Sequence, residues 1–157
     1  MNLSFPHSFK FLGSILIMIS LISCESDTPG SDYTPPGGSF GLVYSKIFST
    51  SCALSGCHNG EDREPALTGE DTYDNIFAKT PANQNAANAM LEYIMASSPD
   101  SSFLYQKITF DSAQFKFGSA MPLGGISLTA DQITFVRQWI VAGAPESGHV
   151  ADRSLVE

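Results

Sequence analysis

Two cysteines and a histidine lie close together in the segment C-A-L-S-G-C-H, residues 52–58. Thiols can add across the vinyl groups of haem to form thioethers, and a histidine directly after the second cysteine can bind the iron. The segment therefore predicts covalent attachment of c-type haem through Cys52 and Cys57. It also predicts that His58 is the proximal iron ligand.

The spacing of the two cysteines is wider than in the usual C-x-x-C-H attachment motif. On a continuous helix Cys52 and Cys57 would lie about 140° apart around the axis, so both thiols would not face one ring. The insert must therefore bulge out of the helix. Ser55 and Gly56 suit such a bulge, because serine favours turns and glycine accepts positive φ.

Met121 is the predicted second iron ligand. It lies in the glycine-rich segment 118–125, shortly before an expected helix. Pro122 stiffens the backbone beside the sulfur and removes one amide donor. A thioether favours ferrous iron and, with a histidine opposite, fills both axial positions. Met90 and Met95 are competing ligands, as is an open position, although their spacing favours packing in the core.

Two interpretations without haem use the same residues. Cys52 and Cys57 can form a local disulfide in a structural or adhesion lipoprotein, with His58 as a surface histidine. Alternatively, the two thiols and His58 can bind zinc, but a fourth ligand is not evident in the sequence.

The first residues predict export of the chain. Residues 1–23 combine a weakly charged start with an apolar run that is too short to span a bilayer, which indicates a lipoprotein signal peptide. Cys24 would then be the lipidated residue, unless it ends an ordinary signal peptide or lies in an uncleaved anchor. Residues 24–39 are rich in Ser, Thr, Pro and Gly and predict a flexible linker.

One domain is expected at residues 40–146, followed by a polar tail at 147–157 in which His149 is solvated. The net charge of the 157 residues is -8. This charge argues against nucleic acid as a partner and favours a partner protein with a basic docking face.

The apolar spacing predicts an all-α fold, because no segment alternates convincingly over the length of a strand. The last helix has the clearest signals: Thr129 and Gln132 can form a capping box, and Gly143 ends the helix. Asn85 or Asn88 can cap the helix expected at residues 86–96. We expect five helices, at residues 40–48, 72–79, 86–96, 101–108 and 129–142.

Three side chains outside the motif are candidates for contact with haem. Trp139 is expected in the core and can also pack on the edge of the ring. Tyr105 and Lys107 can donate hydrogen bonds to a propionate.

The chain resembles the cytochrome c-like domains of bacterial envelope lipoproteins over residues 40–146. The resemblance implies a cytochrome c-like fold of three to five helices with long loops around one haem. It implies thioethers at Cys52 and Cys57, His58 as proximal ligand and Met121 as distal ligand. With both axial positions filled, we expect an electron-transfer protein and not an enzyme. The N-terminal residues predict that it is held by lipid in the cell envelope, on the periplasmic side or at the outer membrane. The matching segments are Ile47-Phe48, 52–60, 99–108, Met121-Pro122 and 133–144.

Overall fold

The computed structural model describes residues 33–110 and 117–157. The predicted signal peptide at residues 1–23 and the predicted lipidation site Cys24 lie outside these ranges.

The described chain is helical, which confirms the predicted all-α class. Within residues 33–110 and 117–157 there are only isolated β-bridges and no strand. No helix in this part of the chain is both long enough and apolar enough to cross a bilayer. The α-helices are α1 (Ser39–Val43), α2 (Thr72–Ile76), α3 (Gln84–Asn88), α4 (Phe103–Thr109) and α5 (Ala130–Val141). A π-helix, η1 (Tyr44–Cys52), and two 3-10 helices, η2 (Pro99–Ser101) and η3 (Arg153–Leu155), complete the set.

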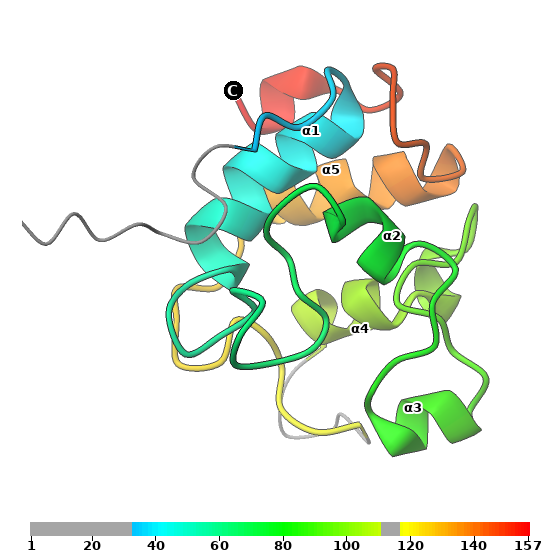
Figure 1. The fold of residues 1–157 in the computed structure, drawn as a ribbon. Helices are drawn as coiled ribbons and strands as arrows, with labels where there is room; N and C mark the ends of the chain where they lie inside the picture. Colours follow the sequence, from blue (N-terminus) through cyan, green and yellow to red (C-terminus); the bar gives the residue numbers. More distant parts are fainter. Residues whose placement is uncertain (1–32, 111–116) are drawn as a thin grey trace, which may run out of the picture.

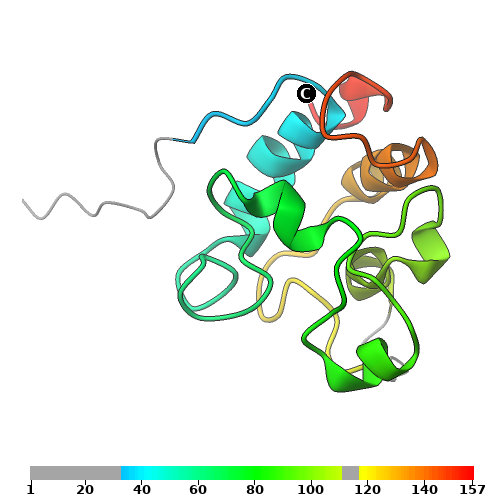
Figure 2. The ribbon, with the colours of Figure 1, turned by 45° about the vertical axis from the view of Figure 1, so that its right-hand side comes forward.

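Helix α5 is the central element of the packing. Helices α1, α4, η2 and η3 all contact it, whereas α3 lies apart at the end of the molecule away from the C-terminus (Figures 1 and 2). The core between these helices is one cluster of buried apolar side chains. Its largest fully buried members are Trp139, Phe40, Phe48, Phe135, Ile47, Ile76, Ile94 and Ile140.

Helices α1 and η1 form one continuous helix that ends at Cys52, so the helix expected at 40–48 is present and longer than predicted. Its apolar stripe is buried as expected. The second half has π-helical hydrogen bonds: Ala53 N–H donates to the carbonyl of Phe48, five residues earlier, at 2.8 Å. The hydroxyl of Ser49 donates to the carbonyl of Tyr44, also five residues earlier. Cys52 is thus the last residue of this helix.

Helix α5 begins as the sequence predicts. The hydroxyl of Thr129 accepts a hydrogen bond from Gln132 N–H at 3.1 Å, and the Gln132 side chain accepts from Thr129 N–H at 2.9 Å. These two bonds satisfy amides that a helix start would leave without partners. After the helix, Gly143 has a φ of 96°, which glycine adopts without strain. The capping box is therefore confirmed.

The third helix differs from its prediction. Helix α3 covers Gln84–Asn88, and its cap is Asn83, whose side-chain oxygen accepts from Ala86 N–H at 3.0 Å. The expected caps Asn85 and Asn88 were wrong, because both lie inside the helix. Met90 has a φ of 58° and is 84% exposed, so its expected packing in the core was also wrong.

The C-terminal segment packs against the start of α1. Gly148 accepts a hydrogen bond from Ser39 N–H at 2.9 Å, and the buried Ser39 hydroxyl accepts from Val150 and Ala151 N–H at 2.9 and 3.0 Å. A Cβ on Gly38 would lie 2.5 Å from the Gly148 carbonyl oxygen. Residues 148–151 are therefore joined to the domain, although His149 is exposed as expected. 

Replacing Ser39 with alanine should destabilise the fold by about 1–3 kcal/mol, because two partly buried hydrogen bonds to backbone amides would lose their acceptor. The matched control is Ser49→Ala, at an exposed position of η1, where we expect less than about 0.5 kcal/mol. Urea unfolding followed by circular dichroism measures both values. Equal losses in the two variants would contradict a specific role for Ser39.

Candidate cofactor site

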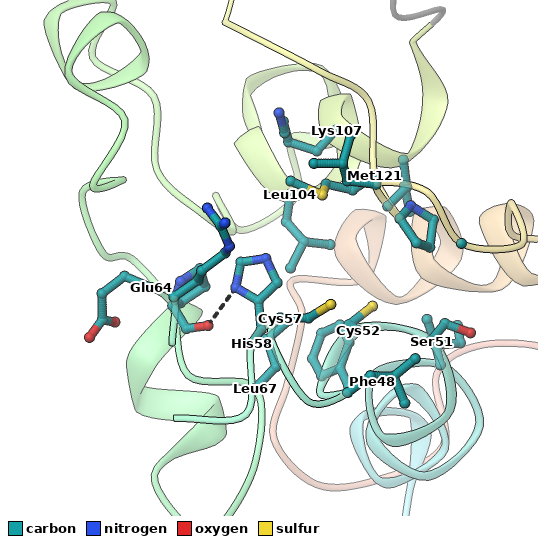
Figure 3. Close-up of a pocket in the computed structure, with 18 of the residues that line it drawn as sticks. Phe48, Ser51, Cys52, Cys57, His58, Glu64, Leu67, Leu104, Lys107 and Met121 are labelled. Carbon is teal, nitrogen blue, oxygen red and sulfur yellow. Dashed lines mark hydrogen bonds between the residues drawn. The ribbon is translucent and has the colours of Figure 1, made fainter. Parts of the chain in front are cut away.

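The four residues predicted to hold haem line one cavity. Cys52, Cys57, His58 and Met121 all contribute to its wall, and its volume is about 660 Å³ (Figure 3). Ligand pockets in proteins typically measure about 300–1,000 Å³. Apolar side chains from several elements form much of the remaining wall: Ile47, Phe48, Leu67, Phe103, Leu104, Ile108, Leu128 and Val136.

The insert between the cysteines forms the predicted bulge. Cys57 N–H donates to the carbonyl of Leu54 at 2.9 Å, and His58 N–H donates to the carbonyl of Cys52 at 3.0 Å. Gly56 has a φ of 78°, which only glycine adopts readily. The bulge removes the angular offset that a continuous helix would impose. Both sulfur atoms consequently point toward the same space (Figure 3).

The loop after His58 folds back on the bulge. The Asp62 carboxylate accepts a hydrogen bond from Gly56 N–H at 2.9 Å, and Arg63 Nε donates to the Gly56 carbonyl at 3.4 Å. The Asn59 side chain accepts from Asp62 N–H at 3.2 Å. Sequence reasoning missed these residues. The Asn59-Gly60 pair is a turn signal, but it does not reveal what the turn contacts.

The imidazole of His58 is oriented by a backbone carbonyl. Its Nδ1 lies 3.0 Å from the carbonyl oxygen of Pro65. Because a carbonyl can only accept, Nδ1 is the donor in this bond, and in the neutral ring this tautomer has its lone pair on Nε2. Leu67 N–H donates to the His58 carbonyl at 2.9 Å and fixes the backbone. Metal-binding histidines usually make a hydrogen bond of this kind through their second nitrogen.

Both cysteines of the motif are free thiols in this structure. The disulfide of the alternative interpretation is therefore not formed here. Burial, with a smaller contribution from neighbouring Cys57, raises the pKa of the Cys52 thiol to about 12. For the zinc interpretation, residues 33–110 and 117–157 contain no group of three or more histidine, cysteine or acidic side chains placed to hold a metal ion.

In the chain with free thiols, Cys52 should react with iodoacetamide at pH 8 about 10- to 100-fold more slowly than in the unfolded chain. The raised pKa lowers the thiolate fraction about 1,000-fold, and the greater nucleophilicity of the more basic thiolate recovers only part of this loss. The rate should rise with pH as the thiolate forms. Peptide mass spectrometry with and without urea measures it, and equal rates in the two states would contradict the burial of Cys52.

Met121 reaches the cavity from the side opposite the cysteines (Figure 3). Its N–H donates to the carbonyl of Lys107 in α4 at 2.7 Å. Met90 and Met95, the competing ligands, do not line the cavity. The structure thus brings Met121, and neither of the other two, together with the C-A-L-S-G-C-H segment.

The three side chains expected near the ring have different positions. Trp139 is fully buried but does not line the cavity, and its Nε1 donates to the Pro145 carbonyl at 2.9 Å. Tyr105 is not part of the wall either. Lys107 does line the cavity, as does Arg63, which the sequence did not single out.

Comparisons with known proteins give no match: no protein family, no curated protein and no solved structure is significantly similar to this chain. Its function must therefore be inferred from the residues of the cavity.

Proposed function

We propose that this chain is a single-haem c-type cytochrome that transfers electrons. One observation supports this function above all others: two thiols, an imidazole with a free Nε2 and a thioether line the same largely apolar cavity. These are the groups that covalent attachment and axial ligation of haem require.

The wall of the cavity fits the proposed group. Cys52 and Cys57 would supply the thioether sulfurs from the two ends of the bulge. Haem would supply an iron that gains and loses one electron. Apolar side chains such as Phe48 and Leu67 would exclude water, which keeps the local dielectric low.

His58 and Met121 would hold the iron. The hydrogen bond from His58 Nδ1 to Pro65 fixes the ring and increases the basicity of Nε2. The softer sulfur of Met121 would favour the reduced state and raise the reduction potential. If both residues bind the iron, they would leave no ligand position for a substrate, which favours electron transfer over catalysis.

The same proposal includes a place and a partner. Lipid on Cys24 would hold the domain in the bacterial cell envelope, on the periplasmic side or at the outer membrane. The net charge of -8 and the exposed carboxylates of Glu61, Asp62 and Glu64 near the cavity favour a redox protein with a basic face.

The test is to produce the protein together with a cytochrome c maturation system and then measure its absorption spectrum and haem staining on a denaturing gel. Covalent haem and a reduced c-type spectrum are expected. Intact mass should show one haem per chain. Colourless protein with a Cys52–Cys57 disulfide, confirmed by mass and thiol count, would refute the proposal in favour of a structural lipoprotein.

A finer prediction concerns Met121→Ala. The variant should keep covalent haem but lose the weak ferric charge-transfer band of sulfur ligation, and its reduction potential should fall by more than about 100 mV, within the range of about 0.8 V that axial ligands control. The control is Met90→Ala at an exposed position, which should leave both unchanged. Retention of the band in Met121→Ala would identify another ligand.

A further inference from the structure

The segment that carries Met121 lacks regular secondary structure. In residues 117–125 only turns and bends are present. A sulfur ligand on such a segment needs external support, because an unsupported loop would move away from the iron on thermal timescales. Asn83 supports the start of the segment by donating to the Phe117 carbonyl at 3.0 Å.

Lys107 contacts this segment at two points. Its carbonyl accepts the hydrogen bond from Met121 N–H at 2.7 Å, and its ammonium group donates to the carbonyl of Ser119. Lys107 lies in the last turn of α4 (Phe103–Thr109), so the amide of Met121 joins its segment to the end of this helix. Lys107 thus binds the backbone on both sides of Ala120, the residue directly before Met121.

The side chain of Lys107 is itself fixed. Its Nζ lies 5.7 Å from the centre of the Phe103 ring, one helical turn earlier in α4. Lys107 as a whole is partly buried. A donor held in this way is suited to restraining a backbone carbonyl.

We propose that Lys107 is a positioning residue for Met121: its ammonium clamps the Ser119 carbonyl and thereby keeps the methionine sulfur directed into the cavity. This inference rests on the proposed haem function and concerns only how the sixth ligand is held. The backbone bond from Met121 to Lys107 does not depend on the side chain, so substitutions at Lys107 isolate the contribution of the clamp.

The experiment compares Lys107→Met with Gln106→Met in the haem-loaded protein. Methionine matches the length of lysine without its donor. Gln106 is the neighbouring position in α4, and its side chain bonds to the carbonyl of Asp100, away from the Met121 segment. The readout is the rate at which saturating imidazole replaces sulfur on the ferric iron, because this rate reports how often the sulfur leaves.

We expect Lys107→Met to accelerate this replacement about 10- to 100-fold, the range that corresponds to loss of one charge-assisted hydrogen bond. Gln106→Met should exchange at the wild-type rate. Thermal unfolding of the two variants should differ little, since the clamp acts on Ser119, which is exposed. Lys107→Arg, which keeps the charge and donors, should exchange near the wild-type rate, an expectation that can be tested even if Lys107→Met does not fold.

Two results would overturn the inference in a recognisable way. If the wild-type protein shows the sulfur band and Lys107→Met exchanges no faster than Gln106→Met, the clamp has no role, while the haem function stands. If Lys107→Arg is as fast as Lys107→Met, the donor is not what holds the segment. Wild-type protein without haem would instead refute the proposed function itself.

Discussion

Cys52→Ser/Cys57→Ser is expected to lose all covalently attached haem, whereas the wild-type chain retains it through denaturation. Serine has no sulfur that could form a thioether with a haem vinyl group. No covalent bond would therefore hold haem to the unfolded chain. Haem staining on a denaturing gel, normalised to total protein, should fall to background. Intact mass should decrease by one haem.

The matched control for this change is Met121→Ala, which alters the opposite wall of the cavity and leaves both thiols in place. Its staining should equal that of the wild type. Haem that remains bound to the double serine variant on the denaturing gel would contradict attachment at these two sulfurs.

Trp139→Ala should reduce the free energy of unfolding by about 3–5 kcal/mol, the usual cost of removing a large buried aromatic side chain. Trp139 is fully buried, its ring lies 5.8 Å from that of Phe40, and its Nε1 donates to the carbonyl of Pro145. This side chain therefore links α5 to α1 and to the segment after α5. A loss of this size is a large part of the free energy of unfolding of a small domain, which is about 5–15 kcal/mol. Denaturant unfolding measures it.

Trp139→Phe provides the control, because it keeps an aromatic ring and removes mainly the indole hydrogen bond. Its loss should be less than half that of Trp139→Ala. Because Trp139 does not line the cavity, the visible spectrum of the folded, haem-loaded Trp139→Phe variant should match the wild type. A shifted spectrum would indicate that Trp139 contacts the haem ring.

The sequence predicts features that depend on neighbouring residues. The capping box of Thr129 and Gln132 is formed by side chains three positions apart, and both partners are visible in the sequence. The same holds for the bulge at Gly56, since the spacing of the cysteines demands one and glycine permits it. These features were predicted correctly because local sterics and hydrogen bonding determine them.

Features that depend on distant contacts were not predictable in the same way. The apolar stripe from Phe40 predicts a helix, but it does not distinguish α-helical from π-helical hydrogen bonding in η1. Lys107 was a candidate for contact with haem and does line the cavity, but its bond to the carbonyl of Ser119, twelve positions later, was not predictable. The packing of Val150 on Ser39 joins residues 111 positions apart. No local pattern encodes such pairings, because tertiary packing selects them.

The pairing of Gly148 with the start of α1 also has a practical consequence. The cavity lies at the far end of the same continuous helix, at Cys52, and a helix of this length measures about 20 Å. An anchor fused after Glu157 would therefore lie nearer the start of this helix than Cys52. Protein immobilised on an electrode through its carboxyl terminus would keep Cys52 on the side away from the electrode.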